Sequence, residues 1–256
     1  MVEERKHIAE SVKNGIVESI KGAGEVINAV VDTVSDSLVT VIKGTGAVGT
    51  ALTSTLSDVV RGAIQGTLQV GGDVGTAAKG TVIGVLRGTK EVGIQTLDTV
   101  STTLQEVVKS VSVIGGDVGE AVKGAVDGVV QGTSQVGGDV GTAAKGAVIG
   151  VLRGTKEIGA QITETVGATA SQVVKSVSAV GGDVVTAAKS AVEGAILGAK
   201  EIGLNAEEAA SAAATGALRA AGDISVSAVE QVRRAVTGTI AGIKVVAKEP
   251  FKTEEK

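Results

Sequence analysis

The stretch VGGDVGTAAKGTVIGVLRGTKEVG, residues 70–93, recurs almost unchanged as residues 136–159, so the two copies lie 66 residues apart. A partial third copy of the same stretch begins at Gly182. Cutting the chain every 11 residues from Lys6 gives 22 consecutive blocks that end at Ala247 without insertion or deletion. Such an internal repeat decides the architecture of a chain, because each repeat is one structural unit.

The composition excludes several classes of protein. The 256 residues include 38 Gly, one Pro and one Phe, with no Cys, Trp or Tyr. Ordinary proteins contain about 7% Gly, so the share here is about twice the usual one. The lack of aromatic side chains argues against an ordinary globular core. A mean hydropathy of +0.34 argues against disorder, and the scarcity of Pro excludes collagen.

The net charge and the lack of targeting signals limit which partners and which cellular location we expect. A net charge of −4 disfavours nucleic acid, which needs a basic surface. The absence of Cys excludes disulfides and zinc–thiolate sites. The polar start of the chain lacks a signal peptide, and no segment is apolar enough for a transmembrane helix. We therefore expect a cytoplasmic or lipid- and membrane-associated protein, with export by an unconventional route left open.

The 11-residue period predicts an amphipathic helix. Eleven residues in three turns correspond to about 3.67 residues per turn, close to the α-helical value. On this cylinder one arc of each block is apolar and the opposite arc carries almost every charge, as expected for an amphipathic helix. The apolar or lipid face contains Val70, Val74, Val82, Val85, Leu86, Val136, Val140, Val148, Val151 and Leu152.

We predict an all-α fold made of one very long, continuous helix over residues 6–248, which packs laterally against other copies. Residues 1–5 form a polar lead, residues 6–247 form the repeat helix, and residues 248–256 form a charged tail that begins next to Pro250. The alternative is a set of helical hairpins that turn at Gly-Gly-Asp sites. These sites are residues 71–73, 115–117, 137–139 and 181–183. The continuous helix is favoured because the helical phase runs through all four sites.

The glycines predict close helix–helix contact. Gly in a helix interior costs about 0.8–1 kcal/mol relative to Ala, so close backbone approach must compensate. One predicted seam has Gly at two positions of six blocks: Gly62 and Gly66, Gly84 and Gly88, Gly128 and Gly132, Gly150 and Gly154, Gly194 and Gly198, Gly238 and Gly242. The second seam, on the other flank of the apolar face, contains Gly72, Gly75, Gly116, Gly119, Gly138 and Gly141.

The charges form two edges on the same cylinder. The basic edge includes Lys79, Lys90, Lys145, Lys156, Lys189 and Lys200. The acidic edge includes Asp73, Asp117, Asp139, Glu91 and Glu157. We expect the basic edge of one helix to pair with the acidic edge of the next copy, which is a heterologous contact that generates tubes or open arrays.

Segments such as GTKEVG at residues 88–93 and GTKEIG at residues 154–159 resemble the 11-residue repeats of synucleins and perilipins. That resemblance implies a long 11/3 helix lying on a membrane or lipid droplet. The chain departs from the family pattern in two ways: its apolar face is richer in Val and Leu, and it has glycine seams. Both departures favour assembly between helices.

These observations predict a non-enzymatic structural protein that self-assembles side by side into a tube, filament or coat, with lipid or another apolar layer on its Val/Ile/Leu face. The alternative is a peripheral protein that folds on lipid surfaces, and a third reading is a coiled-coil spacer. The expected partners are other copies and lipid, without nucleic acid or a small-molecule substrate. We expect no catalytic, cofactor-binding or metal-binding residues, and no cofactor other than bound lipid. The single histidine, His7, is expected to be solvated.

Overall fold

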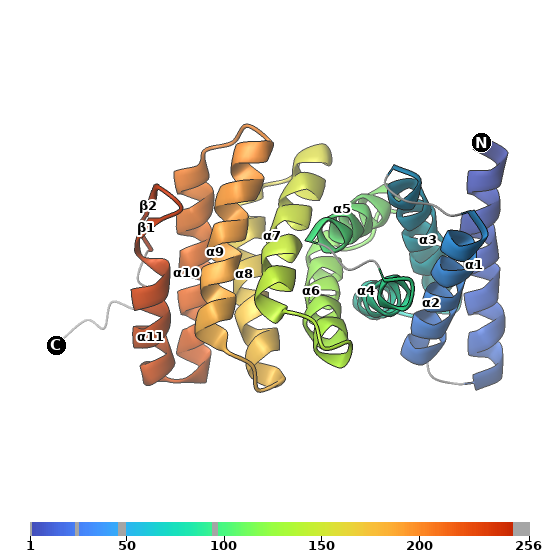
Figure 1. Ribbon diagram of the computed structural model, residues 1–256, viewed down its shortest axis with the longest axis horizontal. Coiled ribbons are helices and arrows are strands. Elements are labelled where there is room, and N and C mark those ends of the chain that lie inside the picture. The colour runs from blue at the N-terminus through green and yellow to red at the C-terminus, as the bar shows by residue number, and fades with distance from the viewer. Residues whose placement is uncertain (1, 24–25, 46–49, 94–96, 248–256) are drawn as a thin grey trace.

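A computed structural model of the chain describes residues 2–23, 26–45, 50–93 and 97–247. These residues form eleven α-helices and one short β-hairpin (Figure 1). The helices are α1 (Val2–Ala23), α2 (Val26–Thr45), α3 (Thr50–Gln69), α4 (Val74–Glu91), α5 (Leu97–Val113), α6 (Val118–Gln135), α7 (Val140–Glu157), α8 (Ile162–Ala179), α9 (Val184–Glu201), α10 (Ala206–Ile224) and α11 (Val226–Val236); the strands are β1 (Gly238–Ile240) and β2 (Ile243–Val245).

The fold is all-helical apart from this hairpin, but the prediction of one continuous helix is wrong. A glycine in the left-handed conformation ends a helix every 22 residues, at Gly71, Gly93, Gly115, Gly137, Gly159, Gly181 and Gly203. At the first of these turns the Gly72 N–H donates to the Thr67 carbonyl over 2.9 Å, and the Gly71 N–H donates to the Leu68 carbonyl over 3.1 Å. This pair of bonds satisfies carbonyls that a helix end leaves unpaired, and the left-handed backbone requires Gly.

Each turn also begins the next helix. Asp73, Asp117, Asp139 and Asp183 accept backbone N–H groups in the first turns of α4, α6, α7 and α9, and Asn205 does the same for α10. The Gly-Gly-Asp sites are therefore hairpin turns. The helical phase is the same before and after each turn because the helices have a constant length. Helices α4, α6, α7, α8 and α9 each have 18 residues, which is five helical turns. Phase continuity thus reports a constant repeat length rather than an unbroken helix.

The helices form two stacked layers. Helices α1 to α10 each pack most extensively on a helix two places away in the chain, with smaller contacts to their antiparallel neighbours, and α11 contacts α9 and α10 about equally. Odd-numbered helices make one layer and even-numbered helices make the other, which is the architecture of an α-solenoid. The stack twists along its length: α7 to α10 run vertically in Figure 1, whereas α4 is seen nearly end-on. Because the long repeat spans three helices, the nearly identical α4 and α7 lie in opposite layers.

The core lies between the layers and consists of Val, Ala, Ile and Leu. Of the residues assigned to the apolar face, Val82, Val85, Leu86, Val136, Val148, Val151 and Leu152 are buried, and Val70, Val74 and Val140 are half-buried. The apolar face of each helix is thus covered by the other helices of the same chain. Small aliphatic side chains suit this core because aromatic rings would hold the closely packed helices apart.

Both ends of the stack expose mostly polar side chains, with Val226 at the start of α11 as an exposed apolar exception. At one end α1 exposes His7, Ser11 and Glu18 on the side that carries glycines in later helices. It begins at Val2, inside the predicted polar lead. At the other end lie α11 and the hairpin, in which β1 pairs antiparallel with β2 and Gly238 lies opposite Val245. The predicted tail, residues 248–256, lies outside the described residues. Polar terminal elements are typical of the capping repeats of solenoids.

Candidate functional site

Five of the six glycine pairs in the first predicted seam lie at contacts between helices of the same layer. A β-carbon on Gly150 of α7 would lie 2.2 Å from the Ser101 carbonyl oxygen of α5, and one on Gly62 of α3 would lie 2.4 Å from the Ala9 carbonyl oxygen of α1. The same close approach joins α4 to α2, α6 to α4 and α9 to α7. The structure thus brings these glycines against another helix of the same chain, where the sequence analysis expected a second copy.

The structure adds a third glycine to three of these seams. Gly80, Gly124 and Gly146 lie one helical turn before the predicted pairs, and a β-carbon on Gly124 would lie 2.1 Å from the Gly75 carbonyl oxygen. These three glycines are not among the residues predicted from the sequence. The signal that identifies them is the pattern GxxxGxxxG, which occurs once in each of α4, α6 and α7.

The remaining glycine assignments do not form one continuous helix seam. Gly238 and Gly242 lie in the β-hairpin, with positive φ angles of 98° and 79°. Gly72, Gly116 and Gly138 lie in turns, and Gly75, Gly119 and Gly141 lie in the first turn of a helix. The second predicted seam is therefore divided. Its three turn glycines reverse the chain, whereas Gly75 lies against α6 and Gly141 against α9, the next helix of the same layer in each case.

Polar contacts replace the glycine seam at every third helix. In α5 and α8 the seam positions carry larger residues, among them Glu106 and Gln172. Glu106 is only 7% exposed and accepts a hydrogen bond from Ser57 of α3 over 2.7 Å. Asp127 of α6 accepts hydrogen bonds from Gln172, over 2.8 Å, and from Ser176, both of α8. The α3–α5 and α6–α8 contacts are accordingly less extensive than the glycine-seamed contacts.

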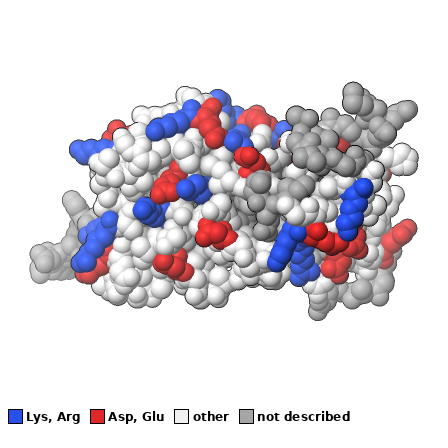
Figure 2. Space-filling view, viewed as in Figure 1, with Lys and Arg blue, Asp and Glu red and all other residues white. Residues whose placement is uncertain are grey.

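The acidic edge pairs within the chain, but with cations that the sequence analysis did not assign to the basic edge. Glu91 lies 2.9 Å from Lys43, and Glu157 lies 3.0 Å from Lys109. Burial lowers the pKa of Lys109, but the hydrogen bonds to Glu157 and Glu106 and the charges of these two acids together raise it above its ordinary value. Each partner cation lies 48 residues before its acid, one helix back in the same layer. On the face seen in Figure 2, cations and acids are accordingly mixed rather than separated.

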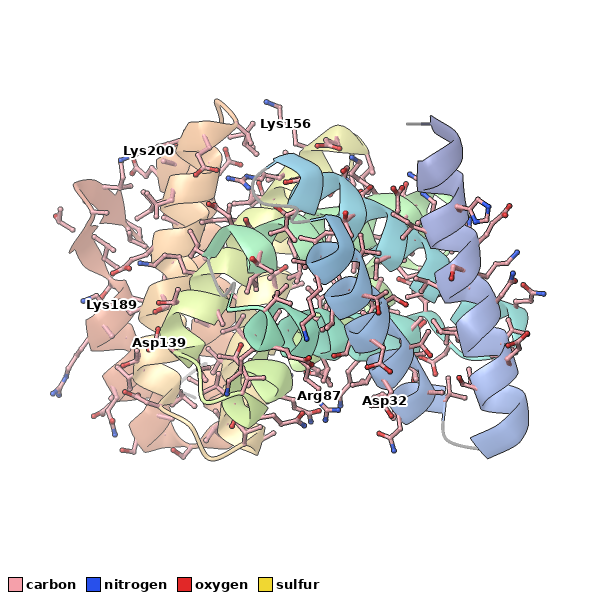
Figure 3. The ribbon with its side chains drawn as sticks, turned by 45° about the vertical axis from the view of Figure 1, so that its right-hand side comes forward. Asp32, Arg87, Asp139, Lys156, Lys189 and Lys200 are labelled. Carbon is pink, nitrogen blue, oxygen red and sulfur yellow. The ribbon has the colours of Figure 1, made fainter. Side chains whose placement is uncertain are left out.

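The lysines of the predicted basic edge have three kinds of position. Lys145 lies 2.6 Å from Glu193 of α9. Lys90 and Lys156 donate hydrogen bonds to the Val136 and Ile202 carbonyls, at the C-terminal ends of α6 and α9. Lys79, Lys189 and Lys200 make no ion pair with a described residue, and Figure 3 shows Lys156 and Lys200 near one edge of the stack. A cation at a helix C-terminus is favoured by the helix dipole.

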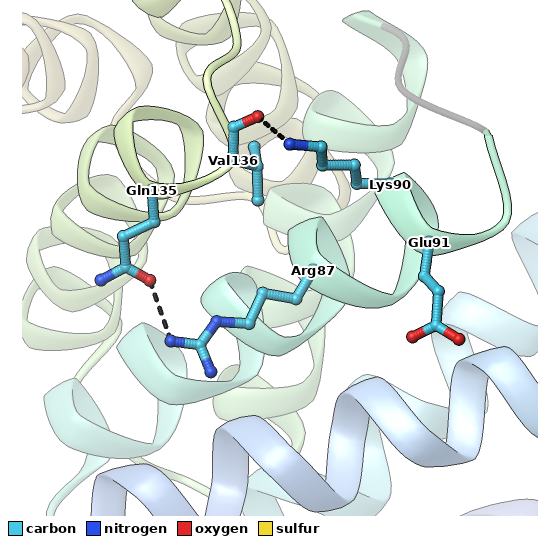
Figure 4. Close-up of a pocket in the computed structure, with 5 residues that line it drawn as sticks. All are labelled: Arg87, Lys90, Glu91, Gln135 and Val136. Carbon is cyan, nitrogen blue, oxygen red and sulfur yellow. Dashed lines mark hydrogen bonds between the residues drawn. The ribbon is translucent and has the colours of Figure 1, made fainter.

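Two surface pockets lie at equivalent places in the repeat, one beside Lys90 and one beside Lys156. One, of about 480 Å³, lies between α4 and α6, where Arg87 donates to Gln135 over 3.0 Å (Figure 4). Arg87 also lies 3.6 Å from Asp32 (Figure 3). The other, of about 550 Å³, lies between α7 and α9, where Arg153 donates to Glu201 over 2.7 Å. In each pocket, polar side chains of one helix form hydrogen bonds to the other helix. These bonds therefore hold the two helices together.

Helix capping accounts for the aspartates of the predicted acidic edge. The hydroxyl and the backbone N–H of Thr142 hold the pKa of Asp139 below its ordinary value. The backbone N–H and the hydroxyl of Thr76 do the same for the pKa of Asp73. Asp117 accepts the backbone N–H of Glu120 over 2.9 Å. These carboxylates begin helices and do not pair with a neighbouring basic edge.

A groove of about 790 Å³ runs across α8 and α10, and we call it the α8–α10 groove. Its charged lining residues are Lys123 of α6, Glu164 and Lys175 of α8, and Glu208 and Arg219 of α10. Small and polar residues of α8 and α10 also line the groove, as does Val246, which follows β2. The sequence analysis did not find this groove, because it depends on how three helices of one layer are placed.

Among the described residues, no group of three or more His, Cys, Asp or Glu side chains lies close enough to hold a metal ion. No helix in the described part of the chain has the length and apolar character needed to cross a membrane. No protein-family model matches the chain, and no curated protein is found to be similar to it.

Proposed function

We propose that the protein is a non-enzymatic structural scaffold that works as a single folded chain. In this role the two-layer stack of helices is a rod that holds other molecules at a fixed separation. The observation that carries the proposal is that the glycine seams and the apolar face both have their partners within the chain. A chain that satisfies these surfaces internally can fold without a second copy or a lipid layer.

The polar ends of the stack give further support. Solenoids that remain single need terminal elements with a polar outer face, because an uncovered apolar end would associate with another copy. Here α1 exposes His7, Ser11 and Glu18, and α11 exposes Glu230, Arg233 and Arg234. These surfaces favour a discrete rod over an open filament.

Lateral self-assembly into a tube, filament or coat, and folding on a lipid surface, remain predictions from the sequence. They differ from the scaffold in measurable ways. Self-assembly requires a mass that grows with protein concentration, and folding on lipid requires helix to appear only when vesicles are added.

The experiment is light scattering and small-angle X-ray scattering on the purified full chain, with circular dichroism before and after addition of anionic vesicles. The scaffold predicts the mass of one chain, 25.1 kDa, over a hundredfold range of concentration and a helical spectrum that vesicles leave unchanged. Ordered tubes in electron micrographs, or a disordered spectrum without lipid, would overturn the proposal.

A further inference from the structure

We propose that the rod has two built-in hinges. One is the α3–α5 contact, with α4 as its pivot, and the other is the α6–α8 contact, with α7 as its pivot. A scaffold role requires only a stable rod, so hinges at defined places go beyond it. The inference draws on the side chains at the two contacts, the tight packing of the opposite layer, and the directions of the two pivot helices.

The two hinge contacts depend on side chains that can rotate. Glu106 of α5 accepts a hydrogen bond from Ser57 of α3 over 2.7 Å. Asp127 of α6 accepts one from Gln172 of α8 over 2.8 Å. Both contacts are much less extensive than the glycine-seamed contacts of the same layer. Local opening needs the least free energy where helices share the fewest contacts, so each layer should open first at these two places.

The opposite layer is tightly packed beside each hinge contact. Helix α4 lies against both α3 and α5, and its contact with α6 is the most extensive between any two helices of the described chain. Helix α7 lies against both α6 and α8, and a β-carbon on Gly194 of α9 would lie 2.6 Å from the Lys145 carbonyl oxygen of α7. Separation of α3 from α5, or of α6 from α8, therefore leaves the opposite layer closed. The helix in that layer then acts as the pivot of a hinge.

The two pivot helices point in different directions because the stack twists. In Figure 1, α4 is seen nearly end-on, whereas α7 runs vertically. Opening of a hinge turns one part of the rod about the axis of its pivot helix. The two hinges therefore bend the rod in different planes. Together they allow the ends of the rod to be reoriented while every helix stays folded.

The test measures the spread of distances across each contact, by double electron–electron resonance between two spin labels on the full chain. The chain contains no Cys, so two introduced cysteines carry the only labels. Gln69→Cys with Val113→Cys spans the α3–α5 hinge, and Val113→Cys with Glu157→Cys spans the α5–α7 glycine seam. These three exposed residues are the last of α3, α5 and α7, so the two pairs have equivalent positions.

The second hinge is tested in the same way. Ser134→Cys with Ser178→Cys spans the α6–α8 hinge, and Lys90→Cys with Ser134→Cys spans the α4–α6 glycine seam. These residues are each the last but one of their helix. Lys90→Cys and Glu157→Cys each remove a polar contact from the seam that they span. Any loosening that this causes makes the comparison stricter, because it widens the control.

We expect the distance distribution across each hinge to be at least about twice as wide as the distribution across its matched seam. Equal widths across a hinge and its seam would overturn the proposal. It is also overturned if the α4–α6 pair shows a distribution as wide as the α3–α5 pair, since α4 would then not act as a pivot and the rod would loosen along its whole length.

A variant shows whether the polar contact sets the hinge. Asp127→Ala should widen the distribution of the α6–α8 pair further, because it removes the acceptor between the two helices. Glu193→Ala is the matched control, since it removes an ion pair with Lys145 across the α7–α9 seam and should leave that distribution unchanged.

Circular dichroism checks that both variants fold, and Asp127→Asn, which should widen the distribution less, replaces Asp127→Ala if the latter does not. An unchanged width in the folded Asp127 variant, or equal widening by Glu193→Ala, contradicts the proposal. The mass measurement that tests the scaffold is independent of all of these results.

Discussion

The two sides of α5 show two ways of joining helices within one layer. Toward α7, the backbone of α5 at Ser101 receives Gly150 in a glycine seam without room for a β-carbon. Toward α3, the buried carboxylate of Glu106 accepts a hydrogen bond from Ser57. The seam depends on the absence of side chains, whereas the polar junction depends on a specific pair of them. The glycine seam should therefore be destabilised by any added side chain. The polar junction should be destabilised only when one of its hydrogen-bonding partners is removed.

The largest effect is expected from Gly150→Ala. The added methyl group would lie 2.2 Å from the Ser101 carbonyl oxygen, and a backbone atom cannot move aside. We expect a loss of about 3 kcal/mol in the free energy of unfolding, at the upper end of overpacking effects. Gly44→Ala, at the exposed end of α2 with nothing within 4 Å, is the control and should gain about 0.5–1 kcal/mol. Urea titration measures both changes, and equal values would show that the seam is not tight.

The polar junction is tested by Asp127→Ala, which leaves Gln172 and Ser176 of α8 without their acceptor. The expected loss is about 1–3 kcal/mol, since a buried polar group without a partner has a cost of that size. Asp127→Asn keeps one acceptor oxygen and should lose less. A double-mutant cycle with Gln172→Ala should give a coupling energy of about 0.5 kcal/mol or more. Simple additivity would mean that this contact does not hold the junction.

Aspartate caps begin α4, α6, α7 and α9, and this capping should respond to acid. A carboxyl whose folded pKa is lowered stabilises the fold above its unfolded pKa of about 3.9, and this stabilisation is lost as the pH falls through the folded pKa. Asp139→Ala should cost about 1 kcal/mol at pH 7. Asp139→Asn keeps a good cap that does not titrate, so its stability relative to the wild type should rise as the pH drops below about 4. Thermal unfolding between pH 3 and pH 7 measures this difference, and a constant difference would contradict it.

The smallest effect is expected from Gln135→Glu. This change would give Arg87 a charged acceptor, as Arg153 has in Glu201 at the equivalent place. Exposed ion pairs contribute about 0.2–1 kcal/mol, so the gain should be small and should disappear in 1 M salt. A gain that persists at high salt would point to packing rather than charge.

Much of the fold follows from one helix considered alone. The apolar positions, the glycine pairs and the Gly-Gly-Asp sites are properties of single repeats, and most of the apolar positions lie in the core. The prediction of a continuous helix was wrong because a repeat of constant length keeps the same helical phase whether or not the chain turns between repeats. Gly71 and Asp73 contained the decisive signal: a left-handed stop followed by a cap.

The contacts between helices could not be predicted in the same way. Glu91 pairs with Lys43 rather than with a lysine of the predicted basic edge, because the offset between parallel helices depends on the turns and on the layer. The α8–α10 groove requires the relative placement of α6, α8 and α10, which a single cylinder does not contain. Its residues differ between repeats, so periodicity alone would not reveal it.

The three-helix length of the long repeat has a consequence for how such a chain can grow. A stack with two layers alternates sides with every helix, so a unit of three helices reverses sides each time it is copied. Duplication of one 66-residue unit ahead of α8 would move the groove and the closing hairpin to the opposite face, relative to α1. Duplication of two units would return them to the original face. Growth by single units thus alternates the direction in which the groove faces, and growth by pairs preserves it.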